Sequence, residues 1–254
     1  MIGTLVPAVG SGAIVGLTLG LIGGGGSIVA TPLLLYVVGI ANPHVAIGTS
    51  AFAVSISAFL NLVGHARAGH VRWICATVFA AIGSAGALLG STIGKAFDAH
   101  HLMILFAVLM VAVGVLMLWP RQQHADAAPR SSLPLCLWTA AVAVAAGVAS
   151  GFFGIGGGFL VVPGLIFATR MPTIDAVGSS LLAVGSFGLA TAFNYAYSGL
   201  VDWPVAFEFI AGGICGGIVG LLLGTRLAGY KNLLNQLFAA LIFAVAGFML
   251  YRTF

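Results

Sequence analysis

The sequence predicts an all-α, polytopic membrane protein with about ten transmembrane segments. Of its 254 residues, 61% are hydrophobic and only 6% are charged, whereas a soluble domain carries roughly 25% charged residues. The apolar residues form continuous blocks of about 17 to 25, the length that crosses a hydrocarbon core of roughly 30 Å. The blocks lack the alternation of apolar and polar positions that is typical of a membrane β-barrel. These observations exclude a soluble protein and a barrel.

The first half of the chain contains five apolar segments, which we expect at residues 5–22, 27–39, 44–64, 73–94 and 101–119. The first segment is expected to be retained, because no lysine or arginine comes before Arg67 and a cleavable signal peptide normally begins with one. The second segment follows the stretch "GLIGGGGS" at residues 20–27, here called the first glycine segment. Its roughly 13 residues reach only about 20 Å, which is short for a crossing.

The second half repeats this order, with segments expected at residues 135–153, 158–169, 174–197, 203–224 and 232–251. Its short segment follows "GFFGIGGG" at residues 151–158, here called the second glycine segment. At an offset of 131, later 130, the aligned pairs include Gly16 with Gly147, Gly20 with Gly151, Pro32 with Pro163, Gly48 with Gly178 and Trp73 with Trp203. We therefore predict two five-segment repeats, residues 1–119 and 134–254, joined by a polar linker at 120–133.

The distribution of lysine and arginine indicates whether the short segments cross. If all ten segments cross, one side carries Arg67, Arg72, Arg121, Arg130, Arg170, Arg226 and Lys231, and the other carries only Lys95 and Arg252. If the short segments do not cross, the bias disappears. Ten crossings are therefore favoured, with the linker in the cytoplasm and both termini outside. Because five crossings per copy is an odd number, the two repeats are predicted to be inverted.

The two glycine segments are the main candidates for a binding site. Glycine clusters end one helix, and the next helix can point its free N–H groups and positive dipole end at an anion. The alternative is that these glycines only allow close helix packing. The candidate residues are Gly23, Gly24, Gly25, Gly26 and Ser27 in the first copy, and Gly154, Gly156, Gly157 and Gly158 in the second.

Another set of glycines recurs at steps of three or four residues in the fourth segment of each copy. This spacing places them along one helical face, where small residues let helix backbones approach closely. We expect a packing role for Gly83, Gly86, Gly90 and Gly94, and for Gly213, Gly216, Gly220 and Gly224.

Adjacent hydroxyl groups occupy matched places in the third segment of each copy. They are Thr49 and Ser50 in "IGTS", and Ser179 and Ser180 in "VGSS". Such hydroxyls can donate to an oxyanion, but they can also bond back to helical carbonyl groups. Both roles stay open at this point.

Four further polar residues lie in or beside apolar sequence. Asn61 and Asn194 are costly in a membrane unless they are paired, so each either contacts the substrate or forms an interhelical hydrogen bond. His65 and Arg67 lie near the cytoplasmic end of the third segment, where they either draw an anion into the inner mouth or anchor the loop at the membrane surface.

The sequence offers no basis for an enzyme. It contains no Walker motif, serine triad, paired carboxylates or metal-ligand cluster, so we expect neither a cofactor nor a metal. The net charge of +4 is explained by membrane topology and gives no evidence of nucleic-acid binding. The expected partners are a small-molecule substrate and the lipid bilayer, and a homodimer stays open.

The sequence resembles the TauE/SafE family of sulfite exporters in three features. These are the paired glycine segments with their following prolines, the subsequent "GTS" and "GSS", and the "G-x3-W" before the fourth segment. The resemblance spans nearly the whole chain, and "GFFGIGGGFLVVP" is its most specific part. The first copy departs from the pattern at Gly24 and Ser27, which stand where the second has Ile155 and Gly158. The resemblance implies transport of sulfite, thiosulfate or organosulfonates across the bacterial inner membrane.

The resulting functional prediction is an exporter of small sulfur-containing anions that works by alternating access around a midplane site. Alternatives are an exporter of neutral or amphipathic metabolites with a five-plus-five repeat, an anion channel, and a membrane scaffold subunit.

Overall fold

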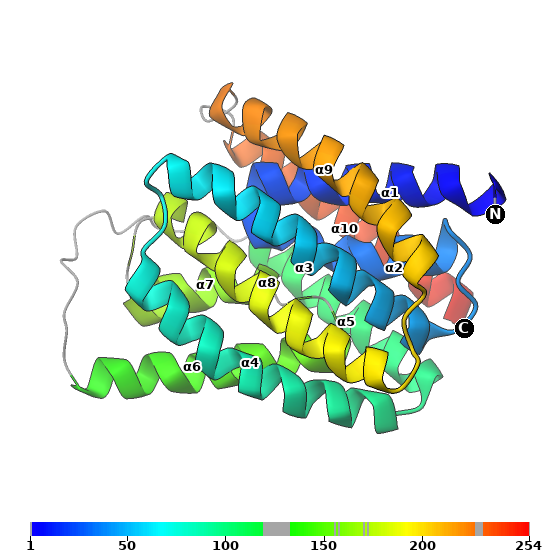
Figure 1. The fold of residues 1–254 in the computed structure, drawn as a ribbon, viewed down its shortest axis with the longest axis horizontal. Helices are drawn as coiled ribbons and strands as arrows, with labels where there is room; N and C mark the ends of the chain where they lie inside the picture. Colours follow the sequence, from blue (N-terminus) through cyan, green and yellow to red (C-terminus); the bar gives the residue numbers. More distant parts are fainter. Residues whose placement is uncertain are drawn as a thin grey trace.

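The computed structural model describes residues 2–118, 133–154, 156, 158–169, 171, 173–226 and 231–253, with side chains described for most of them. Within these residues the chain folds into ten α-helices and one 3-10 helix, joined by short turns (Figure 1). In chain order they are α1 (Ile2–Ile22), the 3-10 helix η1 (Gly23–Val29), α2 (Ala30–Tyr36), α3 (Pro43–Arg67), α4 (Trp73–Ala96), α5 (Ala99–Leu118), α6 (Leu133–Phe153), α7 (Gly158–Thr169), α8 (Thr173–Tyr197), α9 (Trp203–Arg226) and α10 (Lys231–Thr253).

The helices have the length and composition of a multi-pass membrane protein, which confirms the predicted class. By these two criteria, the four that can cross a membrane are Pro43–Arg67, Trp73–Ala96, Asp175–Tyr197 and Trp203–Leu223. Five shorter apolar helices of 10–17 residues accompany them in the part that was searched, the described residues. Ten crossings stay a prediction.

α3 and α8, the two central helices, end at glycines that occupy matched positions in the two halves. Gly69 has φ +77 and Gly199 has φ +68, a left-handed conformation that favours glycine. The chain then turns back on the helix, where the N–H of His70 donates to the carbonyl of His65 and that of Leu200 donates to the carbonyl of Tyr195, both at 3.0 Å. The aligned sequences thus produce the same local structure twice.

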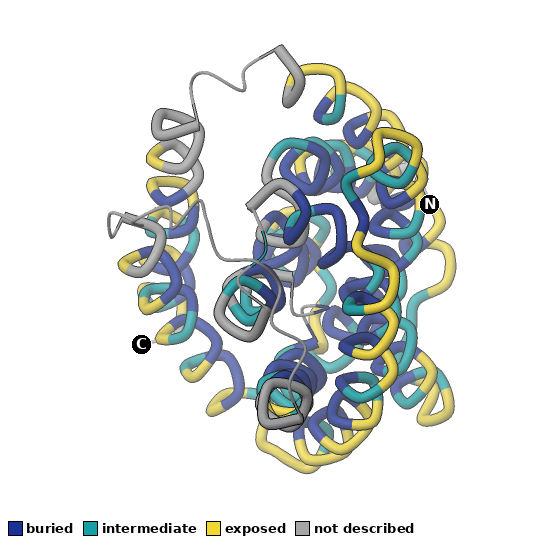
Figure 2. Tube along the Cα trace, turned by 90° about the vertical axis from the view of Figure 1, so that its left-hand side faces the viewer, coloured by how far each residue is buried: buried dark blue, intermediate teal, exposed yellow. Residues whose placement is uncertain are grey.

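The helices pack in matched pairs that join the two halves of the chain. α1 packs on α9 and α4 packs on α6, so the first segment of each half lies against the fourth segment of the other. α3 lies against α8, and α5 lies against α10. Figure 2 shows that buried residues concentrate in the interior of this bundle, while exposed residues lie along its outer sides.

Glycines allow these pairs to approach closely, as the sequence predicts. A Cβ atom on Gly16 of α1 would collide with the backbone of Gly213 in α9, and one on Gly147 of α6 would collide with the backbone of Gly83 in α4. The two contacts are related by the offset of the repeat. The packing role of Gly83 and Gly213 is therefore confirmed, and close backbone contact supplies the dispersion attraction that holds helices together in lipid.

The short second segments differ between the two halves. The sequence predicts a helix over 27–39, but η1 continues directly from α1 and α2 begins only at Ala30. The first glycine segment therefore winds into a tight 3-10 helix instead of forming an open break. In the second half the helix is interrupted, because Gly154 and Gly156 have φ values of +65 and +66, and α7 starts at Gly158.

Candidate functional site

The second glycine segment lies at the centre of the bundle, between α3 and α8. A Cβ atom on Gly156 would stand 3.3 Å from Cγ1 of Val54 on α3 and 3.3 Å from Cγ1 of Val184 on α8. Val54 and Val184 are matched positions at the offset of 130. Gly156 is buried, and it contacts equivalent points of both halves of the chain.

Gly154, two residues before Gly156, also approaches α3. A Cβ atom on it would collide with the side chain of Ile47, and its φ of +65 suits glycine. Gly158 is the first residue of α7, and Gly157 lies outside the described residues. α7, which begins at Gly158, also contacts η1, which contains most of the first glycine segment.

The first glycine segment packs on α1. Gly23, Gly24, Gly25, Gly26 and Ser27 all belong to η1. A Cβ atom on Gly26 would stand 2.7 Å from the backbone nitrogen of Leu19 and closer still to the hydroxyl of Thr18. Ser27 is completely buried. The helices η1 and α7 are in contact, but the two glycine segments have different backbone conformations.

Thr49 and Ser179 hold the turns that precede α9 and α4. The hydroxyl oxygen of Thr49 accepts a hydrogen bond from the backbone N–H of Asp202 at 2.9 Å. The hydroxyl oxygen of Ser179 accepts one from the backbone N–H of Arg72, also at 2.9 Å. These hydrogen bonds are equivalent in the two halves, and they give both hydroxyls a structural role.

Ser50 and Ser180 bond back to their own helices, which is one of the two roles left open by the sequence. Ser50 donates to the carbonyl of Ile47 at 3.0 Å, and Ser180 donates to that of Val177 at 2.7 Å. The hydroxyl of Thr31 on α2 lies 2.9 Å from that of Ser50 and ties the short helix to α3.

The two asparagines have different surroundings. Asn61 on α3 is 7% exposed and donates through Nδ2 to the carbonyl of Ser57 at 2.9 Å. It lies against Gly217 of α9, where a Cβ atom would come within 2.8 Å of its Nδ2. Asn194 on α8 instead forms interhelical hydrogen bonds from Nδ2 to the hydroxyls of Ser91 at 2.6 Å and Thr92 at 2.9 Å on α4.

Lys95 completes the polar contacts around Asn194 and forms with it a cluster that the sequence pattern does not predict. The Lys95 ammonium donates to the backbone oxygen of Asn194 at 3.0 Å, to its Oδ1 at 2.8 Å, and to the hydroxyl of Ser198 at 2.8 Å. It also lies 5.9 Å from the centre of the Tyr195 ring. The three donors of the ammonium group therefore join the ends of α4 and α8.

His65 and Arg67, the candidates for the inner mouth, lie in the last turn of α3. Arg67 is exposed, whereas Nε2 of His65 is buried and has no hydrogen-bond partner among the described residues. Next to them, Nε of Arg72 donates to Oδ2 of Asp175 at 2.8 Å, and Nδ1 of His70 lies 3.7 Å from Oδ1 of that aspartate. The predicted topology places Arg72 and Asp175 on the same side, a signal that could have identified this pair.

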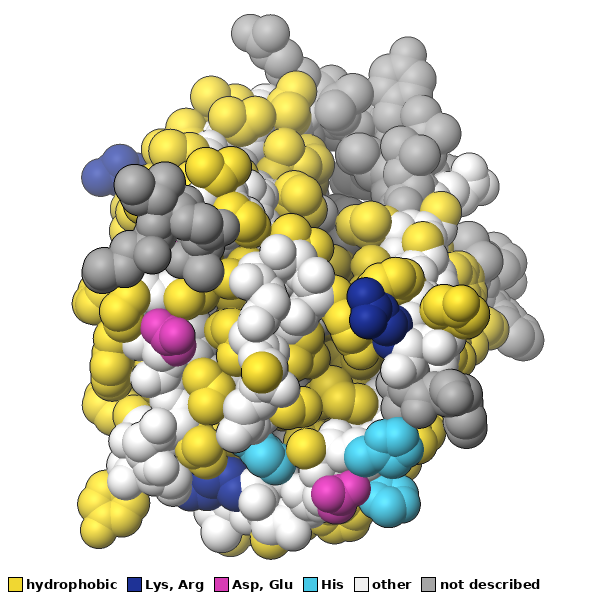
Figure 3. All heavy atoms as spheres, turned by 90° about the vertical axis from the view of Figure 1, so that its right-hand side faces the viewer, with side chains coloured by type: hydrophobic (Ala, Val, Ile, Leu, Met, Phe, Trp, Pro, Cys, Tyr) yellow, Lys and Arg dark blue, Asp and Glu magenta, His cyan; other side chains and the backbone are white. Residues whose placement is uncertain are grey.

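The opposite end of the bundle, where the chain starts and finishes, carries scattered charges. Figure 3 shows that charged and histidine side chains on this face stand between hydrophobic ones. Asp98, in the turn before α5, lies 3.1 Å from Nδ1 of His101. This hydrogen bond lowers the pKa of Asp98.

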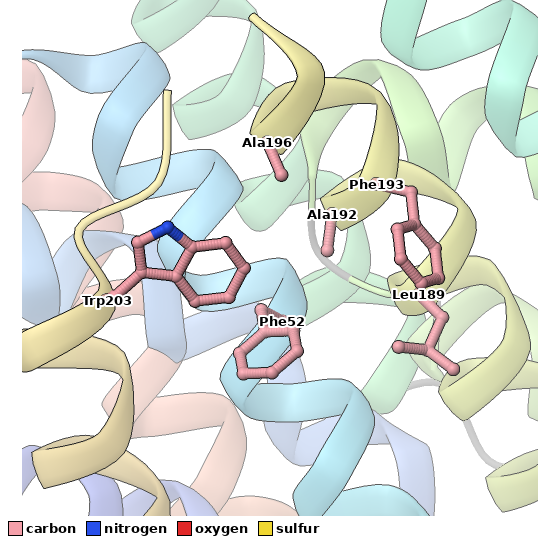
Figure 4. A pocket seen from close by; sticks show the side chains of 6 residues that line it. All are labelled: Phe52, Leu189, Ala192, Phe193, Ala196 and Trp203. Atoms are coloured by element: carbon pink, nitrogen blue, oxygen red, sulfur yellow. The ribbon is translucent and has the colours of Figure 1, made fainter. Parts of the chain in front are cut away.

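An apolar pocket lies between α3, α8 and the start of α9, away from the glycine segments (Figure 4). It is lined by Phe52, Leu189, Ala192, Phe193, Ala196 and Trp203. Phe193 is 70% exposed and Trp203 is 45% exposed, so the pocket opens on the outer surface of the bundle. Within the described residues, no group of three histidine, cysteine or acidic side chains could hold a metal ion.

Comparisons with known proteins agree with the membrane architecture. The sulfite exporter TauE/SafE family matches residues 8–249. A probable membrane transporter protein of Xylella fastidiosa (strain Temecula1 / ATCC 700964) is 57% identical over 255 residues, which cover 98% of this chain and 96% of the relative. The probable membrane transporter protein YdhB of Bacillus subtilis (strain 168) is 26% identical over 211 residues, 82% of this chain and 85% of that protein.

Another relative comes from Methanocaldococcus jannaschii. Its probable membrane transporter protein MJ0441 is 29% identical over 209 residues, 77% of each chain. No solved structure matches this chain. The family match over nearly the whole length and the extent of the first relative lead to one conclusion: the chain belongs to the TauE/SafE family of sulfite exporters and is a multi-pass membrane transporter.

Proposed function

We propose that this protein exports small sulfur-containing anions, such as sulfite, thiosulfate or organosulfonates, across the bacterial inner membrane. The two five-segment repeats, residues 1–119 and 134–254, would rock around a central anion site with the linker at 120–133 in the cytoplasm and both termini outside. The observation that carries this proposal is the position of Gly156 between the equivalent residues Val54 and Val184.

The inverted arrangement is supported by helix direction and by helix pairing. Contacts of Gly16 with Gly213 and of Gly20 with Gly217 advance along both helices together, so α1 and α9 are parallel. In Figure 1, α1 begins toward the end where the C-terminus also lies, and α6 begins toward the opposite end. A two-fold axis in the membrane plane relates helices in this way. The exchange of first and fourth segments between the halves has the same symmetry.

The chemistry of the centre suits an oxyanion. A glycine segment can offer backbone N–H groups without adding a charge to the membrane, and the start of α7 adds the positive end of a helix dipole. The interior of a cell is negative, so export of an anion is favoured by about 2.3 kcal/mol per charge per 100 mV. Export driven by the membrane potential needs no coupling carboxylate at this site.

The proposal is tested by measuring flux through the purified full-length protein in liposomes. Sulfite, thiosulfate, methanesulfonate and leucine would each be loaded separately, and release would be followed with the membrane potential clamped at zero and at a negative interior value. We expect saturable release of at least one sulfur anion, faster at negative interior potential and stimulated by anion on the opposite side. Release of leucine alone would instead support a carrier of neutral metabolites, and flux that does not saturate would support a channel.

A further inference from the structure

The inner side of α3 carries three polar residues that lead away from the central glycine. Ser57, Asn61 and His65 recur every four residues. At about 100° per residue, they fall within an arc of about 80° on the helix, and this arc includes the direction of Val54. Val54 is the residue that approaches Gly156. The three side chains therefore form a polar stripe from the centre of the bundle to the end that carries Arg67.

The polar stripe keeps hydrogen-bonding capacity that its own helix does not use. Ser57 is 1% exposed, yet its hydroxyl has no partner among the described residues. Three other buried helical serines, Ser50, Ser91 and Ser180, each donate to a carbonyl three residues earlier, whereas the hydroxyls of Ser11 and Ser150 also have no partner among the described residues. Nε2 of His65 is also buried and unpartnered within the described structure. A buried polar atom without a partner calls for an explanation such as a bound group.

Two of the three equivalent positions on α8 carry aromatic side chains, and the third, which corresponds to Asn61, carries Thr191. At the offset of 130, Ser57 and His65 correspond to Phe187 and Tyr195, and both of these are completely buried. The ring of Phe187 stacks on Phe79 at 6.1 Å between centroids and lies against Gly83, where a Cβ atom would collide with it. Large aromatic side chains on α8 therefore occupy the positions where α3 carries the hydroxyl of Ser57 and the imidazole of His65.

We propose that the polar stripe of Ser57, Asn61 and His65 is the half of the translocation route that connects the central glycine site to the Arg67 end. The inference rests on the proposed function and extends it to a route and to Ser57, a residue outside the glycine segments. The hydroxyl, amide and imidazole groups follow one another at about 6 Å, four residues along the helix. They hydrogen-bond in succession to a small oxyanion as it loses part of its hydration shell, while Phe187 and Tyr195 close the opposite half in this structure.

Thiol labelling tests the route without any transported substrate. Cys75, Cys136 and Cys215 would first be replaced by alanine, and Ser57→Cys or Thr191→Cys would then be introduced. Thr191 is the matched control, because it is also completely buried with an unpartnered hydroxyl and lies on the closed half. A negatively charged methanethiosulfonate applied from the Arg67 end is expected to modify Ser57→Cys at least tenfold faster than Thr191→Cys. Equal rates, or no modification of Ser57→Cys, would overturn the route.

Flux measurements on the protein with its native cysteines provide the second readout. Ser57→Ala should reduce thiosulfate flux at least tenfold, whereas Thr191→Ala should change it less than twofold, with both proteins eluting as the wild type does in size-exclusion chromatography. Wild-type flux in Ser57→Ala would overturn the inference. Labelling confined to Ser57→Cys, combined with a wild-type protein that moves no sulfur anion, would refute the proposed substrate and leave the route standing.

Discussion

Replacing Gly156 by alanine separates a role in anion binding from a role in backbone conformation. Gly156 has φ +66, and an alanine in this left-handed region costs about 1–2 kcal/mol. The new methyl group would stand 3.3 Å from Cγ1 of both Val54 and Val184, so the two side chains must move apart by a few tenths of an ångström. The substitution therefore strains the backbone and also changes the point where the two halves meet.

Gly199→Ala is the matched control. Gly199 has φ +68, and a Cβ atom there meets no other atom within 4 Å. The two variants should therefore share the conformational cost. At roughly 2–4 °C per kcal/mol, we expect the melting temperature in detergent to fall by about 2–8 °C in each.

Transport should distinguish the two variants. We expect Gly156→Ala to lower the initial rate of thiosulfate release from liposomes at least tenfold, because its methyl group would displace an anion from the backbone N–H groups that are proposed to bind it. Gly199→Ala should retain at least half of the wild-type rate. Equal rates in the two variants would refute the assignment of Gly156 to the site, because backbone strain alone would then explain the loss of transport.

Two further predictions concern the packing of the helices. Gly16→Ala should prevent recovery of folded protein, because its Cβ atom would collide with the backbone of α9. The Cβ atom of Gly10→Ala in the same helix would meet no atom within 4 Å, so this variant should stabilise the protein by about 0.5–1 kcal/mol. The yields of the two variants after size-exclusion chromatography test this prediction. Lys95→Met removes three hydrogen bonds of a charged donor and should lower the free energy of unfolding by about 1.5–3 kcal/mol. Arg252→Met loses a contact of 5.7 Å with the Phe248 ring and should lower it by about 0.5–1 kcal/mol. Thermal unfolding measures both variants, and equal losses would contradict the structural role of Lys95.

Most of the architecture could be predicted from the sequence because lipid imposes a simple pattern. Apolar blocks predicted the helices to within a few residues, except for the short segment at 27–39. The spacing of three and four residues placed Gly83 and Gly213 on contact faces, as the structure confirms, but only the structure shows that these faces meet α6 and α1.

The conformation of the glycine segments could not be predicted in the same way. Both copies are rich in glycine, and glycine permits a 3-10 helix as readily as a left-handed turn. The structure gives the first conformation to Gly23–Val29 and the second to Gly154 and Gly156. Nothing in the spacing of the glycines decides between them, because the choice depends on how each segment packs on its neighbours.

The polar contacts of the site depend on tertiary structure. Lys95 reads as a loop cation in the sequence, but its ammonium reaches Asn194 and Ser198 on a helix about 100 residues away. Ser57 reads as an ordinary helical serine, and only the structure reveals that its hydroxyl is buried without the usual partner. The roles of Lys95 and Ser57 depend on the residues that surround them in the folded protein, and spacing along the chain does not predict those neighbours.

The most direct test of the central claim is to locate an anion bound to the protein. The wild-type protein would be crystallised with selenite, whose selenium atom is identified by anomalous scattering. We predict one selenite per chain beside Gly156, between Val54 of α3 and Val184 of α8. Selenite bound elsewhere, with no anomalous signal between these two helices, would contradict the claim that the glycine segments form the anion site.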